Sequence, residues 1–466
     1  MTQTEKTQLV WLRNDLRITD NPALYNASKN GFTVAVFCIC EKQWQEHNDS
    51  PAKIGLIRDT LIALAKQLNT KNIPVKILIS DWYANIPKQL AKLCSKLNVE
   101  SIWFNNEYPV NEAKRDLQVE KALSHIGVNT HRFDGDVIAK PGSVVNGSGS
   151  MFQVFTPFAN RWRKTITLSD LDVVKAPRKQ SESAIKSDKI PAFGGNYRED
   201  LWLSDANKIH AHLESFIQNR ESDYEENRDF PNINGTSTVS PYLTVGSLSV
   251  RECLNTLLKH SGHEALEKQW TTELIWREFY RHLMAKDKKL SKGYCFKHVG
   301  DNLPWNNDKL FDQWCLGQTG YPIVDAGMRQ LNQTGWMHNR VRMIVAAFLT
   351  KLMRIDWHLG ETYFMQHLID GDFASNNGGW QWSASVGADA VPYFRIFNPY
   401  RQSEKFDPNG DYIRRFVPEL KSITDKKIHQ PTDTQCATLN YPKPIVDYAK
   451  ERKYTLDILE KTFKQI

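Results

Sequence analysis

The chain has 466 residues, of which 41% are hydrophobic and 24% are charged, and its net charge is +7. This length exceeds one ordinary hydrophobic core, so we expect two domains in a globular protein. We find no apolar run of membrane-spanning length and no signal-peptide pattern at the N-terminus. The composition therefore argues against a secreted or membrane-embedded protein, and the modest positive charge gives only a hint of an anionic partner.

Cysteine and tryptophan usage is informative. The cysteines are odd in number and scattered, and no pair has metal-ligand spacing, so we expect reduced thiols in a cytoplasmic protein. Fourteen tryptophans are several times the ordinary number, and most of them lie after Trp202. The C-terminal part is therefore the more unusual half of the chain.

The first 130 residues alternate short apolar runs with amphipathic stretches. Buried strands are predicted at Leu9–Leu12, Val34–Ile39, Val75–Ile79 and Ser101–Phe104, and helices at Ser50–Leu68 and Ala84–Leu97. This alternation predicts a doubly wound parallel sheet. The first strand is not followed by G-x-G-x-x-G, so the dinucleotide-binding fingerprint is missing.

After a polar stretch between residues 170 and 199, helical periodicity dominates. Helices are predicted at Asp205–Arg220, Ser249–Lys259, Trp270–Ala285, Ile323–Gln333, Met337–Arg354 and Glu361–Ile369. We therefore predict an α/β plus all-α architecture: an N-terminal α/β domain over residues 1–130, a linker over 131–203, and an all-helical domain over 204–466.

The most unusual stretch combines Asp370-Gly-Asp372 with Asn376–Trp382 and Pro392–Pro399. Its carboxylates, amides, paired glycines and indoles suit the wall of a cavity better than a core. The two aspartates have a spacing that ribose hydroxyls or a divalent metal could use. We expect no metal, because no third carboxylate lies close to them in the sequence.

A second pattern lies on one predicted helix, where Glu273, Trp276, Arg277 and Tyr280 are spaced i, i+3, i+4 and i+7. These residues share a face. An acid, a base and two aromatic rings could hold a flat polar ligand; the alternative is an exposed amphipathic face with an ion pair.

Two further segments are ambiguous by themselves. Gly235–Tyr242 places hydroxyls and a glycine before a helix, which suits either a phosphate or ordinary capping. Trp336–Met343 carries arginine next to asparagine, so it could contact a phosphate and a base edge, although its methionine is more typical of packing.

Together these motifs resemble the photolyase/cryptochrome family, and specifically the bacterial folate-type class I photolyases of cyclobutane pyrimidine dimers. The resemblance extends from Trp11–Arg17 to Tyr441–Ile445. Its internal motifs occur in the family order, at Glu273–Tyr280, Thr319–Asp325, Thr334–Arg340 and Asn376–Trp382.

The resemblance implies that the helical domain holds a U-shaped FAD, whose catalytic form is the two-electron-reduced anion FADH⁻. Light would excite this flavin, an electron would pass to the pyrimidine dimer, the ring would split and the electron would return. Asn376 matches the residue that faces flavin N5. The other implied FAD-binding residues are Tyr224, Thr236, Ser237, Thr238, Val239, Ser240, Trp270, Arg342, Asp370, Gly371 and Asp372.

The resemblance also implies a pocket for a dimer flipped out of damaged DNA, at a cost of a few kcal/mol. The implied catalytic residues are Glu273, Trp276, Met343 and Asn376. The implied DNA and substrate contacts are Arg228, Glu273, Trp276, Arg277, Tyr280, Asn339, Arg340, Met343, Trp382, Arg395 and Gln402. No protein partner is required, and we expect a cytoplasmic monomer associated with the nucleoid through DNA.

Trp305, Trp357 and Trp380 would each be typical core residues, but they match the family's electron-transfer chain from flavin to surface. A methenyltetrahydrofolate antenna is implied at His47, Asn111, Glu112 and Lys292.

The sequence departs from the family pattern at three positions. Thr238 stands where an arginine is usual in the phosphate loop, Val239 replaces leucine, and Ser291 lies beside Lys292 where the folate-type pattern can carry cysteine. The missing arginine could loosen FAD or require a compensating residue elsewhere.

Three alternatives remain. Enzymes of 6-4 photoproducts and animal-type cryptochromes carry histidines where this chain has Asn339 and Met343. Plant-type light sensors place aspartate opposite flavin N5, where this chain has Asn376. A nucleotide-binding oxidoreductase with a helical cap would leave the aromatic pocket unexplained.

Overall fold

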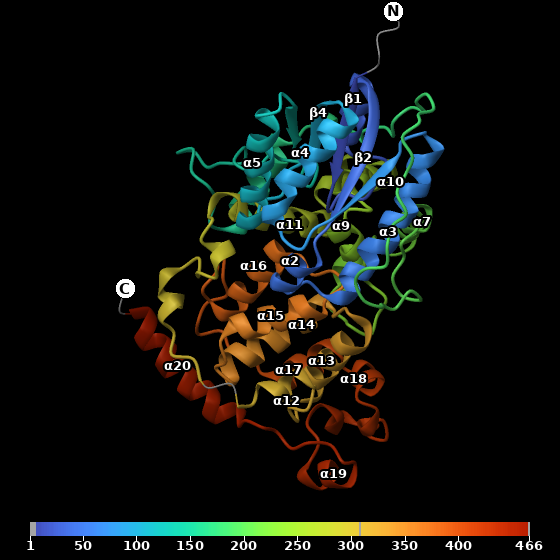
Figure 1. Ribbon diagram of the computed structural model, residues 1–466. Helices are drawn as coiled ribbons and strands as arrows, with labels where there is room; N and C mark the ends of the chain where they lie inside the picture. The colour runs from blue at the N-terminus through green and yellow to red at the C-terminus, as the bar shows by residue number, and fades with distance from the viewer. Residues whose placement is uncertain (1–5, 307–308, 465–466) are drawn as a thin grey trace, which may run out of the picture. The chain divides into compact units, whose positions relative to one another are not determined.

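The computed structural model describes residues 6–306 and 309–464. The described residues form two compact units, whose helices and strands are labelled in Figure 1. The sheet unit comprises the described parts of Met1–Phe152, Thr156–Asn219 and Thr238–Lys288. The helical unit comprises those of Gln153–Phe155, Arg220–Ser237 and Lys289–Ile466.

Parallel strands form the centre of the sheet unit. They are β1 (Thr7–Leu12), β2 (Phe32–Ile39), β3 (Val75–Ile79), β4 (Val99–Asn105) and β5 (Asn129–Phe133), in the order β3-β2-β1-β4-β5. Every residue of β1 and β2 is buried. Central strands covered on both faces need such continuous apolar runs, which is why the sequence pattern identified them.

Helices connect the strands and continue beyond them. Those of the sheet unit are α1 (Pro22–Asn30), α2 (Glu41–Glu46), α3 (Pro51–Thr70), α4 (Ile86–Leu97), α5 (Val110–Ser124), α6 (Phe155–Thr165, apart from its first residue), α7 (Ala206–Asn219), α9 (Ser240–Val245), α10 (Val250–Ser261) and α11 (Gln269–Lys286). Short 3₁₀ helices occur at Tyr83–Asn85, Leu168–Leu171 and Gly262–Leu266. Helices α4 and α5 pack against each other, and α1 packs on β1 and β4.

The helical unit is built around one large apolar core. Its helices are α8 (Tyr224–Asn227), α12 (Phe311–Cys315), α13 (Pro322–Thr334), α14 (Asn339–Ala347), α15 (Trp357–His367), α16 (Phe373–Ala384), α17 (Pro399–Phe406), α18 (Asp411–Phe416), α19 (Asp433–Thr438) and α20 (Tyr448–Lys464). A π-helical turn, Phe348–Leu352, follows α14 directly, and 3₁₀ helices occur at Leu290–Lys292, His298–Asn302, Pro418–Leu420 and Lys426–His429. The core includes Trp314, Trp357 and Trp380.

Local sequence explains where several of these helices begin and end. Ser249 and Glu252 form a capping box that starts α10. Asp372 caps α16 by accepting a hydrogen bond from the Ser375 N–H at 2.9 Å. Helix α13 begins with Pro322 and ends before Gly335, whose φ of +71° favours glycine.

The predicted fold class, a parallel-sheet unit followed by a helical unit, is confirmed. The expected ranges 1–130, 131–203 and 204–466 remain predictions, because compactness groups α7, α10 and α11 with the sheet and does not mark functional domains. The expected linker range contains α6 and a 3₁₀ turn.

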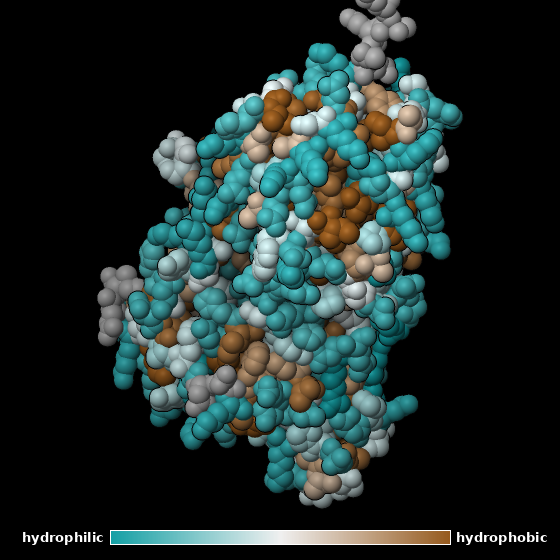
Figure 2. Space-filling model, viewed as in Figure 1, coloured by the Kyte–Doolittle hydropathy of each residue, from teal (hydrophilic) through white to brown (hydrophobic). Residues whose placement is uncertain are grey.

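The surface and the cysteines are those of a folded globular chain. All seven cysteines are free and buried. Among the described residues, no helix has the length and apolar content needed to cross a membrane. Hydrophilic residues cover most of the surface visible in Figure 2, with hydrophobic residues scattered between them.

Candidate functional site

Helix α16 positions Asn376, and a buried glutamate on α15 holds it. The Asn376 side chain donates from Nδ2 to the Glu361 carbonyl oxygen at 3.0 Å. The next residue, Asn377, donates to Glu361 Oε1 at 2.8 Å and accepts from Gln381 Nε2 at 3.0 Å. Because Nδ2 of Asn376 is used in this bond, its Oδ1 is directed away from the Glu361 carbonyl.

Glu361 is 8% exposed, and burial raises the pKa of its carboxyl to about 7. No motif in the sequence pointed to this residue. The available signal was an acidic residue in a predicted helix whose neighbours Phe364 and Met365 are apolar and buried. Its position next to Asn376 could not be seen without the structure.

The three tryptophans of the predicted electron-transfer chain share the core of the helical unit. Trp357 is fully buried, Trp380 is 2% exposed, and Trp305 packs on the same core while remaining partly exposed. The Trp380 ring lies directly against Gly360, one turn after Trp357, where a Cβ atom would overlap it. Trp305 precedes Asn306, which bonds to the carbonyl oxygens of Met353 (2.9 Å) and Arg354 (2.7 Å).

Helix α14 and its neighbours carry several predicted FAD and DNA residues. Arg342 donates two hydrogen bonds to Asp370, at 2.9 and 3.0 Å. Arg340 binds Asp229 at 2.7 and 3.2 Å, and its guanidinium lies 4.4 Å from the Phe406 ring centroid. Asn339 is exposed and Met343 is half-buried.

His338 adds an unsatisfied group to this segment. It is 2% exposed, and burial lowers its pKa to about 4, so the ring is neutral. Its Nδ1 accepts the Arg340 N–H, which leaves the proton on Nε2, and Nε2 has no acceptor among the described residues. A buried donor of this kind is suited to an acceptor from outside the chain.

The predicted phosphate loop follows α8 in the chain. Tyr224 on α8 is buried, and Arg228 lies 5.7 Å from its ring centroid. Thr236 and Ser237 belong to the helical unit, whereas Thr238, Val239 and Ser240 belong to the sheet unit. Thr238 has a φ of +50°, which is unusual for a β-branched residue.

Helix α11 of the sheet unit carries the predicted acid–aromatic face. The Trp276 and Tyr280 rings have centroids 5.6 Å apart, and Glu273 accepts from Gln269 Nε2 at 2.8 Å. Trp270 at the start of the helix is 2% exposed and packs on Phe216. The shared face predicted from the i, i+3 and i+7 spacing is therefore present.

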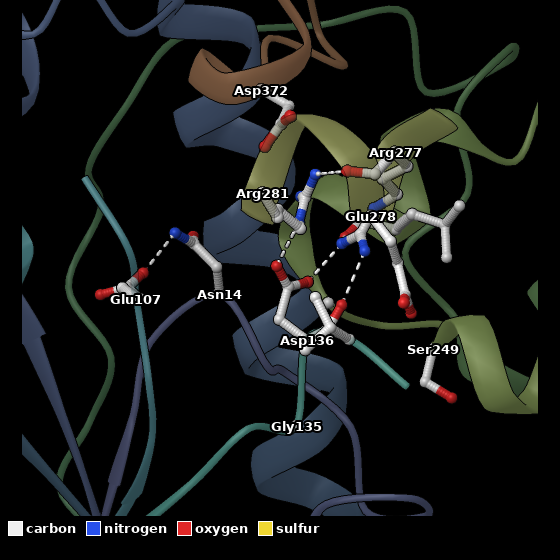
Figure 3. A network of polar contacts seen from close by, with 12 residues as sticks. Asn14, Glu107, Gly135, Asp136, Ser249, Arg277, Glu278, Arg281 and Asp372 are labelled. Atoms are coloured by element: carbon white, nitrogen blue, oxygen red, sulfur yellow. Dashed lines mark hydrogen bonds and ion pairs between the residues drawn. The ribbon is translucent and has the colours of Figure 1, made fainter. Parts of the chain in front are cut away.

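Arg277 points into a polar network rather than into solvent (Figure 3). It and Arg281 both form ion pairs with Asp136, and Arg277 donates to the Asp136 carbonyl at 2.7 Å. Glu278 accepts the backbone N–H groups of Ile138 and Ala139 and is fully buried. Together these residues fasten the segment after β5 to α11, a structural role that the sequence did not indicate.

Three of the predicted antenna residues meet in the sheet unit. His47 pairs with Glu112 at 3.3 Å, and its Nε2 lies 3.0 Å from Asn111 Nδ2. Against the effect of burial, this pair raises the pKa of His47 and lowers the pKa of Glu112. The fourth, Lys292, is an exposed residue of the helical unit.

The remaining predicted residues belong to the helical unit. Trp382 on α16 and Gln402 on α17 are half-buried, and Arg395 is exposed in the loop before α17. Asp372 is the N-cap of α16, and Gly371 is buried beside Asp370. Among the described residues there is no cluster of three or more His, Cys, Asp or Glu side chains that could hold a metal ion.

Family models match most of the chain. Residues 8–179 match the model described as DNA photolyase, and residues 270–461 match the FAD binding domain of DNA photolyase. The chain is 45% identical to deoxyribodipyrimidine photo-lyase of Vibrio cholerae over 96% of its length and 98% of the relative. Its identity to deoxyribodipyrimidine photo-lyase of Escherichia coli is 43%, over 97% of this chain and 98% of that protein.

Solved structures agree with this placement. A class III photolyase from Agrobacterium tumefaciens matches with a TM-score of 0.89 and 33% identity over 100% of this chain and 99% of that one. A Synechocystis cryptochrome matches with a TM-score of 0.83 and 28% identity, covering 98% of this chain and all of that one. With its sheet, its FAD-binding domain and these full-length relatives, the chain belongs to the DNA photolyase family.

Proposed function

We propose that this protein is a deoxyribodipyrimidine photo-lyase, which binds FAD and uses light to split cyclobutane pyrimidine dimers in DNA. The observation that carries the proposal is the 45% identity, over 96% of the chain, to a relative of that name. Bound FAD would supply the electron that opens the dimer. The residues of this chain bind and orient the flavin and the lesion.

The environment of Asn376 supports a reduced flavin as the ligand. Its amide nitrogen is held by the Glu361 carbonyl, so Oδ1 is the atom it offers to a bound group. An amide oxygen accepts hydrogen bonds, and N5 of a two-electron-reduced flavin carries a hydrogen. Asn376 can therefore accept a hydrogen bond from N5 of the reduced flavin. The hydrogen bond from Asn377 to Glu361 connects α16 to α15.

The face of α11 supports binding of a pyrimidine dimer flipped out of the duplex. The indole of Trp276 and the ring of Tyr280 offer stacking surfaces, and stacking of one base on an aromatic ring contributes roughly 1–3 kcal/mol. The Glu273 carboxyl can accept a hydrogen bond from a pyrimidine N–H. From the helical unit we assign Asn339, Met343 and Trp382 to the same lesion.

Arginines would provide a sequence-independent hold on DNA phosphates. Arg395 is exposed, and Arg228 and Arg340 flank Asp229 at 4.0 and 2.7 Å. A phosphate can compete with Asp229 for either guanidinium. Arg277 has less support for this role, because Asp136 already binds it. Gln402 completes the proposed contacts.

We further assign Trp380, Trp357 and Trp305 to electron transfer toward the surface, supported by their shared core and by the partial exposure of Trp305. A folate-type antenna is proposed at His47, Asn111, Glu112 and Lys292. We also propose that the protein acts as a cytoplasmic monomer on nucleoid DNA.

The test is light-dependent repair in solution. FAD-loaded protein, reduced chemically, is mixed with ultraviolet-irradiated oligothymidylate, and the absorbance at the thymine maximum is followed under blue light. A rise under light and none in the dark is expected, because splitting restores the pyrimidine double bonds. Unirradiated oligothymidylate is the substrate control. No rise on dimers, with a rise on an oligonucleotide carrying a 6-4 photoproduct, would assign the other lesion.

A further inference from the structure

An arginine that the family comparison did not single out lies against the predicted phosphate loop. Arg220 Nη1 donates to Asn234 Oδ1 at 2.5 Å, to the Asn234 carbonyl at 3.3 Å and to the Thr236 carbonyl at 3.2 Å. All three residues belong to the helical unit. A single guanidinium nitrogen therefore donates hydrogen bonds to two backbone carbonyl oxygens of the same loop, so both carbonyl groups point toward Arg220.

This arrangement determines the direction of two backbone N–H groups. In a trans peptide the C=O and the following N–H point in opposite directions. Since the carbonyls of Asn234 and Thr236 point at Arg220, the N–H groups of Gly235 and Ser237 point away from it. Two N–H groups turned to the same side can both donate to one anion, and a cation behind the carbonyls polarises these peptides further.

The loop is also fixed from the side of α8. A Cβ atom at Gly235 would lie 2.7 Å from Cβ and 2.9 Å from the carbonyl oxygen of Asn227. Glycine is needed here for this close approach of the two backbones. The loop is thus held by Arg220 and by its packing on α8, which limits the reorganisation needed when an anion binds.

The other end of the same loop carries a threonine in place of the family's arginine. Position 238, where the family pattern has an arginine, is Thr238, whose hydroxyl lies 3.1 Å from His212 Nε2 within the sheet unit. Arg220, which follows α7, places a positive charge against the first part of this loop.

We propose that Arg220 is a positioning residue for the FAD diphosphate: it holds the carbonyls of Asn234 and Thr236 and so presents the N–H groups of Gly235 and Ser237 to phosphate oxygens. This inference rests on the proposed function, because it takes FAD as the ligand. It assigns to Arg220 the electrostatic contribution that Thr238 cannot make.

The test measures FAD affinity of the apoprotein by quenching of flavin fluorescence. Arg220→Gln should weaken FAD binding about tenfold or more, the size expected when charge-assisted hydrogen bonds are lost. Arg220→Lys, which keeps the charge, should lose clearly less. Arg198→Gln is the matched control, since Arg198 is exposed and paired with Asp200, and it should bind FAD as the parent does.

Competition by ADP and by adenosine separates a phosphate role from a general structural one. ADP carries the diphosphate and adenosine does not. The parent protein should therefore bind ADP more tightly than adenosine, and this preference should be smaller in Arg220→Gln. Adding Thr238→Arg to that variant should restore the preference. A structural defect would weaken both competitors equally, and that outcome overturns the proposal.

Unchanged FAD affinity in Arg220→Gln would also overturn it. If circular dichroism shows that Arg220→Gln does not fold, the test uses Arg220→Lys instead. A ratio of ADP affinity to adenosine affinity equal to that of the parent protein would then overturn the proposal. Failure of the parent apoprotein to bind FAD would refute the proposed function instead, so the two outcomes are distinguishable.

Discussion

The buried carboxyl of Glu361 makes the stability of the helical unit depend on pH in a direction that can be worked out. Burial raises the pKa of Glu361 from 4.5 to about 7. Each pKa unit corresponds to about 1.4 kcal/mol, so the ionised carboxylate costs the folded state about 3 kcal/mol. A raised acid pKa means that this cost is absent below the unfolded pKa and is fully present above the folded one.

Replacing Glu361 with glutamine removes the titration but keeps an oxygen that can accept from Asn377. Between about pH 5.5 and about pH 8.5, the free energy of unfolding of the parent should therefore fall by about 2 kcal/mol more than that of Glu361→Gln. Urea unfolding followed by circular dichroism at both pH values measures this difference. Glu226→Gln, at an exposed position of α8, serves as the control.

Infrared spectroscopy provides a second measurement of the same group. A protonated carboxyl has a C=O stretch that disappears on ionisation, and the parent protein should show such a band titrating near neutral pH. The band should be absent in Glu361→Gln. If the parent and Glu361→Gln lost stability in parallel as the pH rose, the assignment of a raised pKa to Glu361 would be wrong.

Three further predictions concern the rings. Gly360→Ala should displace the Trp380 ring, lower the free energy of unfolding by about 1–3 kcal/mol and slow photoreduction; unchanged thermal melting would contradict the close contact. Trp305→Phe should stop photoreduction of the oxidised enzyme, measured by flavin absorbance, yet spare repair by chemically reduced enzyme. Loss of both photoreduction and repair would contradict the assignment of Trp305 to electron transfer. Trp276→Ala should weaken binding of dimer-containing DNA by roughly 1–3 kcal/mol in a mobility-shift titration, with FAD affinity unchanged; an equal affinity for damaged DNA would place Trp276 outside the pocket.

Local sequence patterns predicted four of the strands correctly, and they failed at β5. Strands β1, β2 and β4 have apolar runs that are buried, and the edge strand β3 (Val75–Ile79) has an apolar run that is only partly buried. The strand β5 (Asn129–Phe133) is polar and only partly buried. Helices α1 and α5 were also missed. Only the pairing of β5 with β4 identifies it as a strand.

Helix α16 was not predicted from the sequence, for a different reason. Its sequence contains Asn376, Asn377 and two glycines, which are poor helix formers, and its apolar residues do not keep to one side. The N-cap Asp372 and packing against α15 stabilise it nevertheless. Tertiary contacts override weak local propensity in this helix.

Spacing along the chain determined which residues share the face of α11, because i, i+3 and i+7 relations are fixed by helix geometry alone. It also supplied the motifs that place the chain in its family. Only the tertiary structure decided that Arg277 pairs with Asp136, that Glu361 holds Asn376, and that Arg220 gathers the carbonyls of Asn234 and Thr236. Arg277 and Asp136 lie far apart in the chain. All three cases depend on burial and side-chain direction, which periodicity does not encode.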